Sequence, residues 1–353
     1  MGYGLPVTGN ENRFVDLTGG YGVDTYFLSE LFDHTDYVEQ NAELCRIAEH
    51  NFKRPTPDNV LRTATGSPIE QSSSPVKGGE ISIHNCTAED FLSSPSRGSG
   101  GFHLIFLDPA RRDCHGGKVF RLEDCTPNVV ALLPTLLQHL QPGGRILLKL
   151  SPMLDITQAI KELSAVSNQY SAVSWDIHVV AIKNEVKEVL LSRKVLTSTP
   201  IQAESQEPTI TAIDLAEPEK AFVFTREEEH RATSLPFQGK LEGAYLYEPN
   251  AAILKAGAYK LIAEQFGLRK LDVNTHLYTS ETFVENFPGR VFKALPLNER
   301  NEVGPQANVL VRNYPLTPEQ LKKKLHLRDG GTAFVIGCRV DGKPSLFIAS
   351  RVN

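Results

Sequence analysis

Cysteine is scarce in this 353-residue sequence, and its spacing argues against two classes of protein. A disulfide-stabilised secreted domain and a zinc site built from paired thiolates both need closely spaced cysteines. The cysteines here form no C-x-x-C pair and are odd in number: Cys45, Cys86, Cys114, Cys125 and Cys338. We therefore expect free thiols in a reducing compartment and no bound metal.

Long apolar runs and a secretory signal are also missing. No apolar stretch approaches the roughly 20 residues needed to cross a bilayer, and residues 1–12 lack the basic and apolar regions of a signal peptide. Apolar residues make up 41% of the chain and charged residues 22%, which is ordinary for a globular protein. These features predict a cytoplasmic protein, long enough for two domains and without a membrane partner.

A strong excess of positive charge is absent, since the net charge is −5. The charge is uneven, however. Residues 1–240 carry 22 Lys and Arg against 31 Asp and Glu, whereas residues 241–353 carry 15 against 11. The basic carboxyl-terminal part is where an RNA backbone would bind. A solvated basic surface without a partner explains the same charge, so both interpretations stay open.

One stretch near the start of the chain is strongly patterned. Residues 14–17 predict a short buried strand, residues 19–22 a glycine turn, and residues 27–31 a helix with apolar positions at helical spacing. Glycines let the backbone bend sharply and approach a ligand closely. About 20 residues further on, a second strand pattern ends in Glu39. This layout is typical of folds that hold a nucleoside at the carboxyl ends of parallel strands, with the acid on the ribose.

The charge beside the turn distinguishes two ligands. A dinucleotide places a pyrophosphate at the helix start and needs three spaced glycines, but Thr25 stands at the third position. Asp16 directly precedes the turn, and its carboxylate would repel a pyrophosphate. A carboxylate suits the ammonium and sulfonium groups of S-adenosylmethionine instead, so the pattern favours this methyl donor as the cofactor.

Three segments resemble, in the expected order, the motifs of class I S-adenosylmethionine-dependent methyltransferases. They are residues 16–24, Glu39, and a strand at 104–107 followed by Asp-Pro-Ala-Arg-Arg at 108–112. More narrowly, the whole chain is similar to bacterial RNA methyltransferases with a THUMP-like carboxyl-terminal domain. The resemblance implies an α/β fold: a Rossmann-like sheet of seven strands, then a smaller α+β region of ferredoxin-like or THUMP-like type.

The resemblance also implies which residues bind the donor. These are Asp16, Thr18, Gly19, Gly20, Gly22, Glu39, Thr87, Ala88 and Asp108. Many relatives have an aspartate in the place of Thr87, where it meets the adenine amine. Thr87 has a second interpretation, as the N-cap of a helix, and the sequence leaves both open.

Asp108 and Pro109 are the predicted catalytic residues. Asp108 ends a continuous apolar strand, where a carboxylate can accept a hydrogen bond from a substrate amine or help to remove a proton. Pro109 fixes the backbone so that neighbouring carbonyl groups point into the cleft. Methyltransferases of exocyclic amines usually have an aromatic residue at the place of Arg111. RNA uridine C5 methyltransferases use a cysteine after the fifth strand, where this chain has Ser151, so a cysteine nucleophile is disfavoured.

The predicted substrate contacts lie in three places. Arg111 and Arg112 can bind a phosphate, although nearby acids are alternative partners. Ser151 follows the fifth strand and borders the expected cleft. Lys322 and Lys323 belong to a basic cluster that either contacts RNA phosphates or is solvated surface.

Composition divides the chain into three parts. Residues 1–195 carry the methyltransferase motifs, with a flexible insertion at about 54–80 that is rich in Pro, Ser, Thr and Gly. Residues 196–240 form a linker with connecting strands, and residues 241–353 the THUMP-like α+β domain. The pattern after residue 250 predicts one helix through about Phe266.

Smaller signals complete the expected structure. The charged residues 227–231 predict a turn, Thr317 predicts the N-cap of a helix, and residues 332–351 predict a hairpin.

We therefore expect an enzyme that transfers a methyl group from S-adenosylmethionine to a nucleobase in structured RNA, such as tRNA or rRNA. Two alternatives stay open. The altered motif at 108–112 and the missing acid at Thr87 also fit a non-catalytic RNA-binding protein that keeps the fold. The other alternative is a methyltransferase that acts on a small molecule or a protein.

Overall fold

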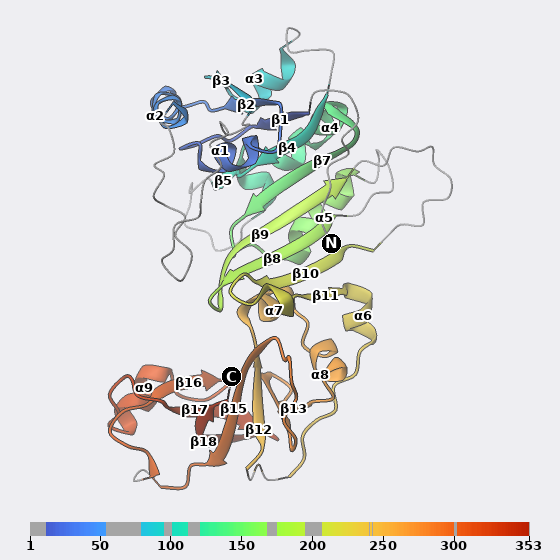
Figure 1. Ribbon diagram of the computed structural model, residues 1–353. Coiled ribbons are helices and arrows are strands. Elements are labelled where there is room, and N and C mark those ends of the chain that lie inside the picture. The colour runs from blue at the N-terminus through green and yellow to red at the C-terminus, as the bar shows by residue number, and fades with distance from the viewer. Residues whose placement is uncertain are drawn as a thin grey trace, which may run out of the picture. The chain divides into compact units, whose positions relative to one another are not determined.

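The computed structural model describes residues 12–53, 79–94, 101–111, 121–167, 175–194, 207–239, 241, 243–299 and 302–352. Most of the predicted insertion, residues 54–78, lies outside these ranges. The chain forms two compact units, one of residues 1–175 with 190–206 and one of residues 176–189 with 207–353 (Figure 1). The domain limits inferred from composition stay a prediction.

The first unit is built on a sheet in the strand order β3-β2-β1-β4-β7-β9. Neighbouring strands from β3 to β7 are parallel. The strands are β1 (Arg13–Asp16), β2 (His34–Val38), β3 (Glu80–His84), β4 (Phe102–Leu107), β7 (Leu140–Leu150) and β9 (Glu185–Lys194). A separate two-stranded ribbon joins β5 (Ala110–Arg111) and β6 (Cys125–Thr126). The helices are α1 (Val23–Ser29), α2 (Ala42–Phe52), α3 (Ala88–Ser93), α4 (Val129–Gln138) and α5 (Ile156–Ser167).

Apolar strands and polar caps explain these elements. Phe14, Tyr37 and Ile105 are fully buried in β1, β2 and β4. Three helices begin at a residue whose side chain accepts backbone N–H groups of the first turn. These N-caps are Asn41, Thr87 and Asn128. α1 and α2 contribute to apolar clusters on one face of the sheet, through Leu28 and Phe52.

The register of the sheet brings three strand ends together. Asp16, at the end of β1, pairs with Tyr37 of β2 and with Phe106 of β4. The segments that follow these strands therefore meet at one edge of the sheet, which is where ligands bind in open α/β folds.

In the second unit, strands follow the order β9-β8-β10-β11, with β9 contributing residues 185–189. The new strands are β8 (Asp176–Ile182), β10 (Thr209–Asp214) and β11 (Phe222–Thr225). β10 is parallel to β8 and antiparallel to β11. The seven predicted strands correspond to β3, β2, β1, β4, β7, β9 and β8. The two connecting strands β10 and β11 extend the sheet at its edge.

The rest of the second unit is a seven-stranded sheet in the order β13-β14-β12-β15-β18-β17-β16, antiparallel except for β16 and β17 (Figure 1). Its strands are β12 (Tyr245–Pro249), β13 (Arg269–Asp272), β14 (Thr275–Ser280), β15 (Gly289–Pro296), β16 (Asn308–Arg312), β17 (Ala333–Val340) and β18 (Lys343–Arg351). Its helices are α7 (Ala251–Ala256), α8 (Leu261–Gln265) and α9 (Pro318–Lys324). The predicted α/β fold with an α+β carboxyl-terminal region is confirmed, as are the hairpin β17–β18 and the cap of α9 by Thr317.

Two local predictions were wrong. The single helix expected through Phe266 is broken after α7 because Gly257 adopts a left-handed conformation with φ +87°. The Glu229 carboxylate accepts the backbone N–H groups of Tyr259, Lys260 and Leu261, which stabilises the start of α8 as a separate helix. Residues 227–231 belong to helix α6 (Arg226–Arg231) rather than to a turn, because Thr225 and Glu228 form a capping box.

Candidate active site

The glycine turn between β1 and α1 needs glycine for two different reasons. At Gly19 the backbone lies directly against the buried ring of Tyr37, so an added Cβ would overlap that ring. Gly20 and Gly22 have left-handed conformations, with φ +54° and +79°. The Tyr37 hydroxyl donates a hydrogen bond of 2.6 Å to the Gly20 carbonyl, so the ring of β2 also fixes the turn.

Asp16 lies beneath the turn and is almost completely buried, at 1% exposure. Its Oδ1 accepts the backbone N–H of Thr18 at 2.9 Å, and its Oδ2 accepts the Thr25 hydroxyl at 2.6 Å. Burial raises the pKa of the Asp16 carboxyl to about 6, against the opposing effect of these hydrogen bonds. Asp16 therefore holds the turn in shape from below.

Glu39 follows β2 and faces the turn. Its Oε2 accepts the backbone N–H of Gly20 at 3.0 Å, and its Oε1 accepts that of Asn41 at 2.7 Å. The same carboxylate thus contacts the turn after β1 and the first residues of the segment leading to α2.

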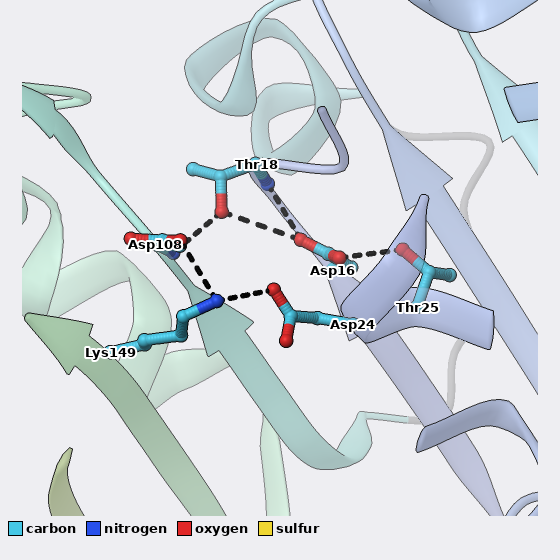
Figure 2. A network of polar contacts seen from close by, with 6 residues as sticks. All are labelled: Asp16, Thr18, Asp24, Thr25, Asp108 and Lys149. Carbon is cyan, nitrogen blue, oxygen red and sulfur yellow. Dashed lines mark hydrogen bonds and ion pairs between the residues drawn. The ribbon is translucent and has the colours of Figure 1, made fainter. Parts of the chain in front are cut away.

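Asp108 follows β4 and is joined to the turn after β1 and to β7 (Figure 2). Its backbone N–H donates to the Thr18 hydroxyl at 2.6 Å, and its Oδ2 lies 3.2 Å from Lys149 Nζ. Lys149, from β7, also donates to Asp24 Oδ2 of α1 at 2.7 Å. Burial raises the pKa of Asp108, although the Lys149 charge partly opposes this rise. Burial acts to lower the pKa of Lys149, but the bonds and charges of Asp24 and Asp108 outweigh it and raise that pKa.

These segments surround a cavity of about 410 Å³, within the range of small-molecule sites, about 300–1,000 Å³. Among the lining residues that the structure describes, three are acids and none is Lys, Arg or His. The lining residues are Leu17, Thr18, Gly20, Glu39, Gln40, Asn41, Leu44, Cys86, Thr87, Ala88, Glu89, Asp108, Ala110, Thr126 and Pro127. A cavity with this charge suits a cation better than a phosphate.

The structure brings most of the predicted donor-binding residues to this cavity. Six of them line it: Thr18, Gly20, Glu39, Thr87, Ala88 and Asp108. Asp16, Gly19 and Gly22 shape the turn beneath it and are not lining residues. Thr87 is the N-cap of α3, because its hydroxyl accepts the Asp90 N–H, and it also lines the cavity; its contact with the adenine stays a prediction.

The predicted catalytic and substrate residues are more scattered. Pro109 is buried behind Asp108. Ser151 follows β7, where its hydroxyl accepts the Met153 N–H at 3.3 Å. Arg111 lies on β5, and Arg112 is outside the described residues. Lys322 and Lys323 lie in the last turn of α9, where Lys322 pairs with Asp329 at 2.6 Å.

Sequence reasoning missed the residues that act across the sheet. The sequence singled out Thr25 only because it stands at the third glycine position of a dinucleotide-binding turn. In the structure its buried hydroxyl donates a hydrogen bond to Asp16. The contacts of Asp24 and Lys149 had no signal, because 125 positions separate the two residues in the chain. Tyr37 could have been found as the aromatic residue that stands two positions before Glu39 in the second strand pattern.

The described residues contain neither a metal-binding group nor a membrane-spanning helix. No group of three or more His, Cys, Asp or Glu side chains is arranged to hold a metal ion within the described ranges. No helix in the part of the chain that the structure describes is long and apolar enough to cross a membrane.

The carboxyl-terminal part matches two family models, a ferredoxin-like domain over residues 245–288 and a THUMP-like domain over residues 293–351. No curated protein sequence matches the chain. A solved protein from Porphyromonas gingivalis W83, described as a candidate methyltransferase, is 32% identical, covering 98% of this chain and 78% of its own, with a TM-score of 0.74.

The chain belongs to the class I methyltransferase family. This similarity extends over nearly the whole methyltransferase, including both carboxyl-terminal domains. An rRNA methylase from Streptococcus thermophilus is 12% identical over 53% of this chain and 88% of its own, with a TM-score of 0.34. An O-methyltransferase from Bacillus cereus is 14% identical over 52% and 74%, also with a TM-score of 0.34. Both TM-scores are low, and no function of this methyltransferase is inferred from either protein.

Proposed function

We propose that this methyltransferase uses S-adenosylmethionine to methylate a nucleobase in structured RNA, such as tRNA or rRNA. The observation that carries the proposal is the acidic cavity at the carboxyl ends of β1, β2 and β4, with Glu39 on one side and Asp108 on the other. The proposal places the reaction in the cytoplasm.

The residues present fit this cofactor. We assign the ribose hydroxyl groups to Glu39 and the adenine to the start of α3 at Thr87 and Ala88, because all three residues line the cavity. The turn at Gly19 and Gly20 brings bare backbone close to the methionine half. When bound, the sulfonium supplies an activated methyl group, so the protein must mainly align the acceptor and keep the site dry.

Asp108 is the residue best placed to meet the acceptor. Its side chain lines the cavity and is 43% exposed, so both the cavity and solvent adjoin this carboxylate. A carboxylate in this place accepts a hydrogen bond from an N–H or O–H group of the acceptor and can receive its proton.

The RNA half of the proposal rests on the second unit. Its THUMP-like match and the three adjacent lysines in the last turn of α9, Lys322, Lys323 and Lys324, support binding to a phosphate backbone. Arg111 and Arg112 follow the catalytic motif and are proposed to contact a phosphate of the same substrate.

Transfer of a tritiated methyl group to total RNA from cells that lack the protein tests this function. We expect incorporation by the wild type, loss with Asp108→Asn, and no change with Asp90→Asn, which alters an exposed carboxylate of α3. Mass spectrometry of the nucleosides would then identify the methylated base. Incorporation into protein or small molecules, with none into RNA, would contradict the substrate.

A non-catalytic RNA-binding role is the second candidate. Arg111 stands where amine methyltransferases usually carry an aromatic residue that stacks on the base, and this difference favours the alternative. Salt-sensitive RNA binding without any methyl incorporation would support it.

A further inference from the structure

The methyltransferase places an ammonium group between two carboxylates beside its donor cavity. Lys149 Nζ lies 2.7 Å from Asp24 Oδ2 and 3.2 Å from Asp108 Oδ2 (Figure 2). Asp108 lines the cavity, whereas Lys149 and Asp24 do not. Lys149 therefore contacts the proposed catalytic carboxylate from outside the cavity.

This arrangement joins three elements of the first unit. Asp24 lies in the first turn of α1, Asp108 follows β4, and Lys149 lies near the end of β7. The Lys149 side chain is only 21% exposed, so its ion pairs are shielded from solvent more than ordinary surface pairs. The backbone of Asp108 is fixed separately by the Thr18 hydroxyl. Lys149 thus determines where the side chain points, and Thr18 where the backbone lies.

We propose that Lys149, which Asp24 holds in place, is a positioning residue for methyl transfer, and that its ammonium group keeps the Asp108 carboxylate ionised and turned toward the acceptor. The proposal rests on the function proposed above and narrows it to acceptors that carry an N–H or O–H group. Such a group donates a hydrogen bond to the ionised carboxylate. Transfer would form a bond from the acceptor nitrogen or oxygen to the methyl carbon and break the bond from that carbon to sulfur, which would leave as a neutral thioether, while the acceptor proton would pass to Asp108 and then to solvent. A carbon acceptor would offer no hydrogen bond to this carboxylate.

The charges that face Asp108 among the described residues act in opposite directions. Lys149 lowers the pKa of Asp108, while burial and the Asp24 charge raise it. Asp16, on β1, interacts with Asp24 and is already weakly acidic because of its burial. Among the described residues, loss of Lys149 would therefore leave Asp108 under the effects of burial and of the Asp24 charge, and the Asp108 proton would be held more tightly.

Titration of the Asp108 carboxyl by carbon-13 NMR in the ligand-free protein tests the proposal, with Asp108→Asn used to assign the signal. We expect the Asp108 pKa to rise in Lys149→Met, to fall in Asp24→Asn, and to stay near the wild-type value in Lys149→Arg. Lys161→Met is the control, because it removes an exposed lysine of α5. Opposite shifts in the two charge variants cannot arise from a general loosening of the fold.

The pH dependence of methyl transfer provides the functional measurement. The acidic limb of the profile should move to higher pH in Lys149→Met, with a rate at pH 6 at least about tenfold below the wild type. In Lys149→Arg the acidic limb of the profile should lie at the same pH as in the wild type. An unchanged Asp108 titration in both Lys149→Met and Asp24→Asn would overturn the positioning role, even if transfer activity fell.

The two proposals can fail separately. If the wild type transfers no methyl group, the proposed function fails, while the titration in the ligand-free protein still decides whether Lys149 controls Asp108. If the wild type methylates a carbon atom of its substrate, the narrowed acceptor class is wrong.

Discussion

The Thr18 hydroxyl accepts a 2.6 Å hydrogen bond from the backbone N–H of Asp108, and so joins the glycine turn after β1 to the motif after β4. Thr18 is itself held by Asp16, whose Oδ1 accepts the Thr18 N–H at 2.9 Å (Figure 2). A buried carboxylate under the turn thereby sets the place of the proposed catalytic residue. The two motifs behave as one unit rather than as separate binding elements.

Thr18→Val should weaken cofactor binding through this link. The change removes the acceptor for the Asp108 N–H while keeping the side-chain volume, so we expect a loss of about 1–2 kcal/mol in binding S-adenosylhomocysteine, or about tenfold. Calorimetric titration measures the change. Thr35→Val is the matched control, because among the described residues the buried Thr35 hydroxyl has no hydrogen-bond partner. Equal losses in both variants would show that the Thr18 hydroxyl has no special role.

Two neighbouring glycines should respond differently to alanine. Gly19→Ala places a methyl group into the buried Tyr37 ring, and we expect a loss of about 3 kcal/mol in the free energy of unfolding. Gly20→Ala has its nearest contact at 3.7 Å, so only the left-handed backbone opposes it, at about 1 kcal/mol. Urea unfolding of both variants measures the difference. A larger effect at Gly20 would contradict the described turn.

The buried Asp16 should make stability depend on pH. Its folded-state pKa of about 6 lies above the ordinary value of 3.8, so the folded protein binds this proton more tightly than the unfolded chain. The stabilisation is full below the ordinary value and is lost as the pH rises through about 6, by about 3 kcal/mol. Asp16→Asn removes this dependence, so the variant should gain stability relative to the wild type between pH 4 and pH 7, as measured by urea unfolding.

Asp36→Asn provides a control of opposite sign. Burial acts to raise the pKa of Asp36, but the bonds and charges of His84 and Arg13 lower it overall. The contribution of Asp36 is therefore complete above its ordinary pKa of 3.8 and is lost as the pH falls below it, so the wild type should lose stability relative to this variant only on acidification below pH 3.8. A pH dependence with one sign in both variants would refute the assignment.

Lys323 should contribute more to RNA binding than its neighbour Lys322. Lys323 is exposed in the last turn of α9, whereas the charge of Lys322 is paired with Asp329 at 2.6 Å. Lys323→Ala should reduce the slope of log affinity against log salt by about 1, as for the loss of one phosphate contact. Filter binding with tRNA and rRNA over a salt series measures the slope, with the exposed Lys53→Ala of the first unit as the control. An equal slope in wild type and Lys323→Ala would remove α9 from the proposed interface.

Local patterns made much of the fold predictable. The short apolar strands, the glycine turn and the caps at Thr87 and Thr317 act within a few residues, so the sequence displays them directly. Helix α6 was missed although its capping box, Thr225 and Glu228, is a local signal, whereas the start of α8 as a separate helix depends on a distant carboxylate, Glu229. Propensity alone does not show such partners.

The candidate site was predictable only in part, for a similar reason. Thr18, Glu39 and Asp108 follow strands, and parallel strands bring their ends together in a known way. The contact of Asp16 with the cofactor stays a prediction; what the sequence did not show is that the Asp16 carboxylate is bonded to Thr18 and Thr25 beneath the turn. The ion pair from Lys149 to Asp24 joins positions 125 residues apart, which only the folded sheet brings together.

Calorimetric titration with S-adenosylmethionine and S-adenosylhomocysteine tests the central claim, that the acidic cavity binds the methyl donor. We predict binding by the wild type with a dissociation constant of about 10 µM or tighter. Glu39→Gln, which alters the wall of the cavity, should weaken it at least about tenfold, and the exposed Glu43→Gln should not. Absence of heat with both ligands, or equal affinity in Glu39→Gln and the wild type, would contradict the claim.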